Sequence, residues 1–360
     1  MAKSIYETFR KLVQQGLNQL DKLFYENLQI ESWTALEALA TQQGLLPLVA
    51  DGLESIPKES RPPKDVMFQW IGLTIQQEKQ YSGQLGMAMK LSQLYQRNFI
   101  RTYVIKGIVL AECYPIPSHR FCSDLDCYLL PSEGSFDAWS LGNDLVRTQG
   151  YEVNVGYYKN STFHLPGLMV ENHRFMVPFR GNKKLARLER VLRGYMLEDK
   201  GEDIIEGTCL YRPPIIVSSL FLIEHAYSHF LHEGLTWRHV LDWMLFSKKH
   251  QNEIDWGMLD SLIDEFGFRK FYDSYSRMGQ YLLGEVSEDE LTKPEKKMLE
   301  DVWAPLDLHE TLHGVKGKLA LAGNTWRARW KYRYFGDISM LCALCIQVWG
   351  YLFVREPRLE

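Results

Sequence analysis

The sequence has few cysteines, and their arrangement indicates neither disulfides nor a complete zinc site. Only six occur among 360 residues, and their spacing is unlike that of a small disulfide-bonded domain. Cys342-Ala-Leu-Cys345 provides at most half of a zinc site and lies in an apolar run, so we expect buried free thiols there. The N-terminal residues also lack the apolar core of a signal peptide. We therefore expect a cytoplasmic protein.

An excess of positive charge is absent as well. The chain has 41 Lys and Arg residues against 45 Asp and Glu residues, which gives a net charge of -4 and a pI near 6.2. This balance argues against general nucleic-acid binding through a basic surface, while a local basic patch stays compatible with it. One such patch is the predicted helix 182–197, either a solvated face or a surface that holds a polyanionic acceptor.

The sequence also lacks a long apolar run. The longest mostly apolar stretch, Ile338 to Val354, has 17 residues, includes Gln347 and Gly350, and follows a segment rich in basic and aromatic residues. Such flanks are typical of a membrane anchor, but this length is at the lower limit for spanning a bilayer. We expect a buried C-terminal helix and no stable membrane insertion.

Hydrophobic periodicity divides the chain into three predicted regions. Residues 1–99 repeat apolar side chains at helical spacing, and residues 181–360 return to that pattern. Between them, residues 100–180 alternate short strands with helices, with strands predicted at 151–158 and 168–177. We therefore predict an α+β fold, in which a small mixed-sheet core lies between helical N-terminal and C-terminal regions.

The central candidate site is the segment Ser123-Asp124-Leu125-Asp126 on a predicted strand. Residues two apart on a strand face the same side, so Asp124 and Asp126 present adjacent carboxylates while Leu125 points into the sheet. Two like charges this close need a positive partner, and Mg²⁺ or Mn²⁺ binds carboxylate oxygens together with water and phosphate. The motif therefore predicts a divalent metal site.

A third carboxylate and a turn complete the predicted site. Glu171 lies on a later predicted strand, and three carboxylates can hold two divalent ions. Lys106-Gly107 ends an earlier strand, and a glycine there lets the backbone approach a triphosphate. Lys106, Arg120 and Ser123 are candidate phosphate donors. These groups fit nucleotidyl transfer, the in-line attack of an acceptor on the α-phosphorus of an NTP.

Several of these residues also have a purely structural interpretation. Lys106 can end its strand as a surface charge, and Arg120 can cap its loop or pair with Glu112. His173, two positions after Glu171, is either an oriented structural histidine or a base.

The motif and its spacing resemble those of a known enzyme group. Ile105-Lys106-Gly107 followed by Arg120-Phe-Cys-Ser-Asp124-Leu-Asp126 is similar to the nucleotidyltransferase superfamily related to DNA polymerase β, and specifically to bacterial uncharacterised nucleotidyltransferases. The similarity extends over most of the first 245 residues. It includes Trp33-Thr-Ala-Leu-Glu-Ala-Leu-Ala, Gly44-Leu-Leu-Pro-Leu-Val, Val170-Glu171-Asn-His173 and the region of His225, Arg238 and Asp242. The resemblance implies Mg²⁺ bound by Asp124, Asp126 and Glu171.

The activity that this resemblance implies is the transfer of NMP from an NTP such as ATP to an unknown acceptor, which is a small molecule, a protein or RNA. Two features depart from the family pattern. Ile108 follows the glycine of the turn where better-studied transferases have Ser or Gly, and Asn172 and Arg174 flank His173. The alternative hypothesis is therefore a catalytically inactive binding or regulatory module that keeps the fold.

A third hypothesis concerns His225 and His229, which lie four residues apart on one helix face. This spacing can bind zinc, as in a zinc hydrolase. The intervening Ala-Tyr-Ser lacks the glutamate of a His-Glu-x-x-His protease, so packing or contact with Arg238 and Asp242 is the competing interpretation.

Overall fold

The computed structural model describes residues 2–17, 32–205, 207–304, 326 and 328–354. The chain forms two compact units, each assembled from separate segments. The first unit consists of Met1–Thr74, Leu222–Leu245 and Asp260–Cys345, and the second of Ile75–Phe221, Phe246–Leu259 and Ile346–Glu360. Helices dominate the first unit and the second contains a mixed sheet, so the predicted α+β class is confirmed. The division into three sequential regions stays a prediction.

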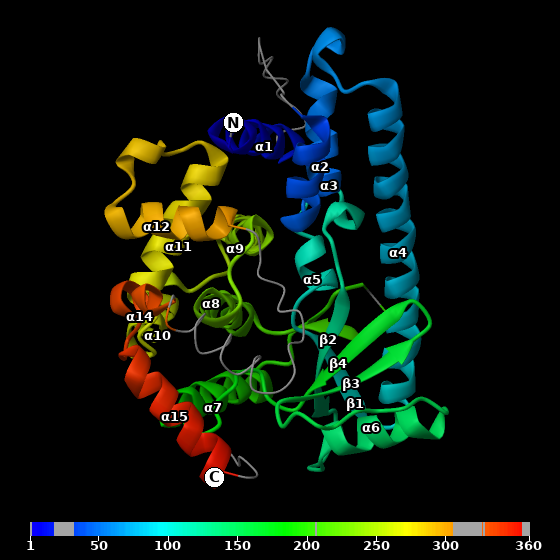
Figure 1. Cartoon of the computed structure of the whole chain (residues 1–360). Coiled ribbons are helices and arrows are strands. Elements are labelled where there is room, and N and C mark those ends of the chain that lie inside the picture. The colour runs from blue at the N-terminus through cyan, green and yellow to red at the C-terminus, as the bar shows by residue number, and fades with distance from the viewer. Residues whose placement is uncertain (1, 18–31, 206, 305–325, 327, 355–360) are drawn as a thin grey trace. The chain divides into compact units, whose positions relative to one another are not determined.

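The second unit is built around a six-stranded sheet of order β3-β4-β2-β1-β6-β5 (Figure 1). The strands are β1 (Ile100–Val104), β2 (Asp124–Pro131), β3 (Asn160–Leu165), β4 (Leu168–His173), β5 (Glu202–Asp203) and β6 (Leu210–Arg212). Strand β2 runs antiparallel to β1 and parallel to β4, and β1 runs parallel to β6. The β3/β4 and β5/β6 pairs are antiparallel. The strand that carries the two aspartates therefore has a neighbour on each side.

One face of this sheet is buried against helices. Among the described residues, four helices lie entirely in the second unit: α5 (Ile108–Ala111), η3 (Pro117–His119), α6 (Ala138–Thr148) and α7 (Lys183–Glu198). Five more of the described helices have residues in both units: α4 (Lys64–Gln96), α8 (Ile215–His232), α9 (Trp237–Lys249), α10 (Trp256–Glu265) and α15 (Met340–Phe353). Apolar side chains of α4 and α6 join those of the strands in one core: Leu91, Tyr95, Ala138, Val146, Leu125, Cys127, Leu129, Phe163 and Val170. Leu125 and Cys127 thus take the core face of β2, as the alternation of the strand predicts.

The first unit packs its helices around a tryptophan. Its remaining helices are α1 (Ala2–Leu17), α2 (Trp33–Gln42), α3 (Leu46–Gly52), η1 (Leu53–Ser55), η2 (Lys58–Ser60), α11 (Arg269–Leu283), η4 (Glu288–Glu290), α12 (Lys293–Trp303) and α14 (Arg329–Phe335). The Trp303 ring lies 4.3 Å from that of Tyr6 and 4.9 Å from that of Trp237. Gln43 accepts from Trp237 N at 2.7 Å and donates to Val302 O at 3.1 Å, so one buried amide ties α9 to α12.

Two strand predictions need correction. Residues 151–158 do not form a strand, and only an isolated bridge joins Asn154 to Thr162. The Asn154 side chain accepts from Gly156 N at 2.9 Å, and such a turn competes with strand pairing. Strand β4 also ends at His173, earlier than the predicted residue 177, because Met176 N and the next amide donate to a helix carboxylate instead of a strand.

The expectation of a buried C-terminal helix is wrong. Leu341, Trp349 and Tyr351 of α15 are 65%, 58% and 77% exposed, and both cysteines of this helix are exposed as well. The contact that α15 makes at Gly350 is narrow, because an added Cβ there would lie 2.6 Å from Arg180 O. The helix therefore approaches the described residues closely at Gly350, while most of its apolar surface is not covered by them.

No described helix is by itself long and apolar enough to cross a membrane. Helices α14 and α15 pass that test of length and composition only together, and they are bent by 109° at the break between them.

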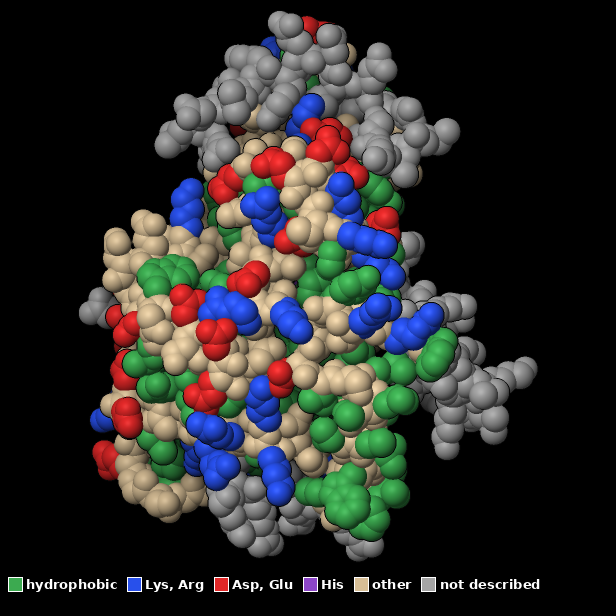
Figure 2. All heavy atoms as spheres, turned by 90° about the vertical axis from the view of Figure 1, so that its left-hand side faces the viewer, with side chains coloured by type: hydrophobic (Ala, Val, Ile, Leu, Met, Phe, Trp, Pro, Cys, Tyr) green, Lys and Arg blue, Asp and Glu red, His purple; other side chains and the backbone are tan. Residues whose placement is uncertain are grey.

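Charges of both signs mix on the face shown in Figure 2. Figure 2 shows basic and acidic side chains of the described residues interspersed over the face in view, with apolar side chains between them. This mixture agrees with the net charge of -4, and this face is unlike the single-sign surface that general nucleic-acid binding uses.

Candidate metal and nucleotide site

The turn after β1 is held against the first residues of β2. Ile105 N donates to Asp126 O at 3.1 Å, which continues the β1–β2 pairing by one residue beyond Val104. Gly107 then adopts φ 63° and ψ −109°, a conformation that L-residues with a Cβ rarely reach. An added Cβ at this position would lie 3.4 Å from Asp124 O. The local backbone therefore brings Lys106 and Gly107 beside both aspartates.

The side chain after this glycine takes no part in the turn. Ile108 begins α5, is 2% exposed and belongs to the core that contains Leu125. Its burial accounts for the apolar side chain at this position.

The predicted third carboxylate lies directly beside the aspartate pair. In the parallel pairing of β2 with β4, Asp126 is the register partner of Glu171, and Asp124 is the partner of Met169. Strand alternation puts His173 on the same face as Glu171, and the register partner of His173 on β2 is Tyr128. The sheet thus brings together Asp126, Glu171 and His173, which are far apart in the sequence.

The contacts of Asp126 centre on one of its two oxygens. Lys106 Nζ lies 3.0 Å from Asp126 Oδ1, and His173 Nε2 lies 2.9 Å from the same oxygen. His173 Nε2 is also 3.3 Å from Glu171 Oε2, while His173 Nδ1 lies 3.4 Å from Phe175 O. Asp126 Oδ2 is buried and has no hydrogen-bond partner among the described residues. A buried anionic oxygen in that position is costly unless a cation or donor reaches it.

The charges of the site act strongly on one another. Burial favours the neutral form of Asp126, but the Lys106 ammonium and the His173 hydrogen bond outweigh it and hold the pKa of Asp126 well below its ordinary value. Burial and the charge of Asp126 raise the pKa of Asp124. Burial disfavours the charged form of Lys106, yet the two aspartates more than offset this and raise its pKa. One ammonium thus faces a cluster of carboxylates, which favours the entry of a further cation.

The other predicted phosphate donors, Ser123 and Arg120, make hydrogen bonds to residues close to them in the sequence. Ser123 Oγ donates to Asp124 Oδ1 at 3.0 Å. Arg120 is 4% exposed, and its Nη1 donates to Phe121 O at 3.2 Å and to Cys122 Sγ at 3.3 Å. These Arg120 contacts lie within its own loop and favour the loop-capping interpretation. The surface-charge interpretation of Lys106 is wrong, because its side chain is only 19% exposed and is paired with Asp126.

His173 is a possible metal ligand as well as a possible base or structural residue. One possible ligand atom each from Asp126, Glu171 and His173 lies within 4.8 Å of the others, so this trio is a candidate metal-binding group. The signal was present in the sequence, because the same alternation that pairs Asp124 with Asp126 pairs Glu171 with His173. Asp124 and Ser123 lie at the more open end of the site.

A second residue that sequence reasoning missed is Glu189 of α7. Its Oε2 accepts from Met176 N at 2.8 Å and from Val177 N at 2.9 Å, so it fixes the segment that follows β4. Burial raises the pKa of Glu189 to about 7. The same helix contacts the site face of β2, where Arg193 Nη1 donates to Tyr128 Oη at 3.2 Å. A glutamate on the buried side of an otherwise apolar helix face was the available signal.

Comparison with known proteins identifies a family. The sequence matches a family described as "Uncharacterised nucleotidyltransferase" over residues 30–284, which is more than half of the chain and includes all six strands. No curated protein and no solved structure matches it. The chain therefore belongs to the family of uncharacterised nucleotidyltransferases.

Proposed function

We propose that the protein is a nucleotidyltransferase that depends on Mg²⁺ or Mn²⁺ and transfers NMP from an NTP to an acceptor. The observation that carries the proposal is the register of β2 with β4, which sets Asp126 beside Glu171. The proposal includes descent from the superfamily related to DNA polymerase β, on the Gly107 turn and the Asp124-Leu125-Asp126 strand.

The donor atoms suit the proposed ion. Asp126 Oδ2 is a buried oxygen without a partner among the described residues, and Glu171 and Asp124 add carboxylates that are partly exposed. Hard oxygen ligands of this kind are those that Mg²⁺ and Mn²⁺ prefer. Asp124, Asp126 and Glu171 would hold the metal, with His173 orienting Asp126. When bound, the ion would neutralise phosphate charge and increase the acidity of an attacking hydroxyl.

The residues of the chain have distinct roles in the proposed reaction. Lys106 and the Gly107 backbone would hold the triphosphate, with Ser123 at the open end of the site. An acceptor oxygen would form a bond to the α-phosphorus as the bond to the bridging oxygen breaks and pyrophosphate leaves. Glu171 would complete the metal site or, alternatively, take the proton of the acceptor hydroxyl, since its side chain is 26% exposed and within reach of solvent. Positioning and charge neutralisation would supply most of the rate enhancement.

A second candidate function is nucleotide binding without turnover. Two observations favour it: the Lys106 ammonium already pairs with Asp126 at 3.0 Å, and the buried Ile108 offers no hydroxyl to a phosphate. In this alternative Lys106 permanently provides the positive charge that a metal provides in an active transferase.

The test is incubation of the protein with each of the four α-labelled NTPs, Mg²⁺ and cell extract. Transfer requires label on a protein, RNA or small molecule together with pyrophosphate release. Both should disappear in Asp126→Asn and persist in Asp144→Asn, a matched change at an exposed aspartate of α6. Nucleotide binding without label transfer would support the second candidate, and binding of no NTP would exclude both.

A further inference from the structure

The structure contains a second cluster of possible metal ligands, in the first unit. Helix α8 supplies His225 and His229, which its four-residue spacing puts on one face, and the first turn of α9 supplies His239. We propose that these three histidines form a binding site for a transition-metal ion of the Zn²⁺ class. The proposal is independent of nucleotidyl transfer, and it concerns metal binding alone.

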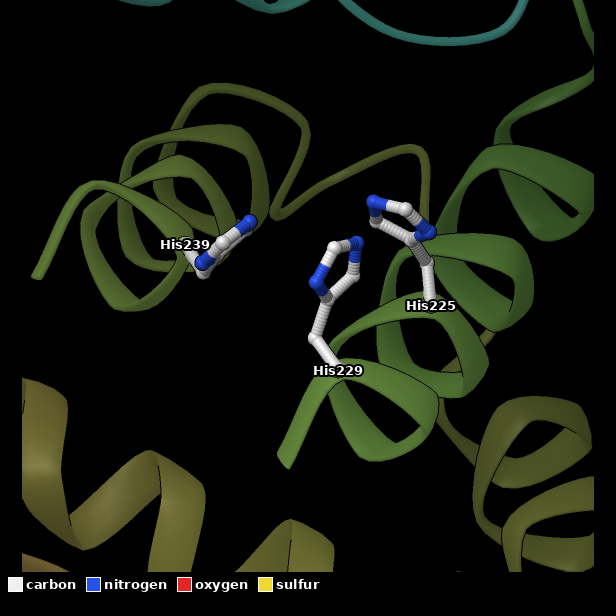
Figure 3. A group of neighbouring side chains, drawn as sticks. All are labelled: His225, His229 and His239. Atoms are coloured by element: carbon white, nitrogen blue, oxygen red, sulfur yellow. The ribbon is translucent and has the colours of Figure 1, made fainter. Parts of the chain in front are cut away.

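The three imidazoles face a common centre. Figure 3 shows the rings of His225 and His229 on neighbouring turns of one helix, with His239 reaching toward them from the other helix. One ring nitrogen of each lies within 4.8 Å of the others. The ring centroid of His229 lies 4.4 Å from the ring centroid of His225 and 4.8 Å from that of His239. Tetrahedral Zn²⁺ with bonds of about 2.0–2.1 Å needs its ligand nitrogens closer together, so small side-chain rotations would complete the site.

Two of the rings are held by groups on their outer side. His229 Nδ1 lies 3.0 Å from Glu233 Oε2, which favours a proton on Nδ1 and leaves the Nε2 lone pair for a metal. A carboxylate behind a metal-binding histidine is a recurrent arrangement that fixes the ring and increases its basicity. This contact is the strongest single support for a metal role, because it sets both the orientation and the tautomer that a ligand requires.

His239 is held in a different way. Its Nδ1 lies 3.0 Å from Thr236 Oγ1 and 3.1 Å from Thr236 N, at the residue that precedes α9. With a metal on Nε2 of His239, the ring proton would reside on Nδ1. Nδ1 would then donate to Thr236 Oγ1 and would no longer accept from Thr236 N. Tyr275 Oη donates to His239 O and anchors the same turn from α11. The site is thus built on two helices whose positions are fixed by other contacts.

The donor chemistry separates this cluster from the carboxylate site. Imidazole nitrogens suit Zn²⁺, Co²⁺ and related ions, whereas carboxylate oxygens suit Mg²⁺. Three protein ligands leave a fourth position for water or another small ligand. The residues between His225 and His229 are Ala226, Tyr227 and Ser228, so this helix supplies no glutamate base of the metalloprotease type.

The test uses Co²⁺ as a spectroscopic probe of the full chain. Titrations are done in the Asp126→Asn background, which removes one ligand of the carboxylate site. We expect visible absorption with the intensity typical of four-coordinate Co²⁺, and its displacement by Zn²⁺. His229→Gln and His239→Gln should each weaken Co²⁺ binding at least about tenfold, and Glu233→Gln should weaken it by about tenfold or more.

The matched control is His164→Gln, because His164 is an exposed histidine on β3 and far from this cluster in sequence. It should leave the Co²⁺ spectrum and affinity unchanged. Circular dichroism of each variant establishes that it is folded. Absence of a Co²⁺ spectrum in the folded protein would overturn the proposal, as would Co²⁺ affinity that is equal in the parent, His229→Gln and His239→Gln proteins.

Discussion

Asp126 and Glu171 are register partners on the parallel strands β2 and β4, although 44 residues separate them in the chain. Strand pairing therefore brings their side chains to the same face of the sheet. His173 Nε2 lies between them, 2.9 Å from Asp126 Oδ1 and 3.3 Å from Glu171 Oε2. This pairing turns a short aspartate motif into a site with acidic groups from two strands.

Replacing Lys106 by methionine tests whether a metal can take over its charge. The change leaves Asp126 buried without its ammonium partner, and loss of one member of such a pair costs about 3 kcal/mol. We expect a lower free energy of unfolding in EDTA and a gain in stability as Mg²⁺ is added, measured by denaturant titration. Lys90→Met, at an exposed lysine of α4, should respond to neither. A Lys106→Met protein that Mg²⁺ fails to stabilise would favour the module without a metal.

Gly107→Ala tests the conformation of the turn. Position 107 has a positive φ, and its added Cβ would meet Asp124 O only at the ordinary contact distance of 3.4 Å. The expected loss of about 1–3 kcal/mol therefore comes from backbone strain. Gly72→Ala is the control, because Gly72 lies inside α4 with open space around its Cβ and should stabilise by about 0.5–1 kcal/mol. Equal effects of the two substitutions on thermal unfolding would contradict this account.

Glu189→Gln tests the buried carboxylate of α7 through pH. Its folded pKa is raised to about 7, above the ordinary value of 4.5, so the folded state binds the proton more tightly. This group therefore favours the folded state at low pH, and that contribution is lost as pH rises from 4.5 through 7. Glutamine can still accept from Met176 N without becoming charged.

We expect the stability of Glu189→Gln, relative to wild type, to rise by up to about 3 kcal/mol between pH 4.5 and pH 7.5. Denaturant unfolding at a series of pH values measures this difference. Glu198→Gln, at the exposed end of the same helix, should show no such trend. A stability difference that is constant over this range would show that Glu189 does not titrate as its burial predicts.

Local patterns predicted the strand that carries the site, but not the details of its pairing. The alternation of Asp124, Leu125 and Asp126 sufficed to assign the carboxylates to one face. The pairing of Asp126 with Glu171 depends on which strands meet and in which register, and these are properties of the folded sheet. The role of Lys106 depends on the same packing. From the sequence alone, its side chain is equally compatible with a position on the surface and with an ion pair to Asp126.

Other errors came from groups that compete with regular structure. Asn154 bonds to Gly156 N and prevents a strand at a sequence that alternates well. Glu189 captures the amides after β4 and shortens that strand. Apolar content alone predicted burial of α15, whereas its helix surface is largely exposed around a narrow contact at Gly350. Of these three, only the capture of the amides by Glu189 involves a residue outside the predicted strand.

Asp126 and Glu171 are proposed to form a metal-dependent nucleotide site. The most direct measurement of this site is calorimetric titration of ATP with and without Mg²⁺. It is done on the wild type, Asp126→Asn, Glu171→Gln and the control Asp144→Asn. We expect binding that requires Mg²⁺ and that weakens by at least about tenfold in Asp126→Asn and Glu171→Gln but not in Asp144→Asn. Equal Mg²⁺-ATP affinity in all four folded proteins would contradict this proposal.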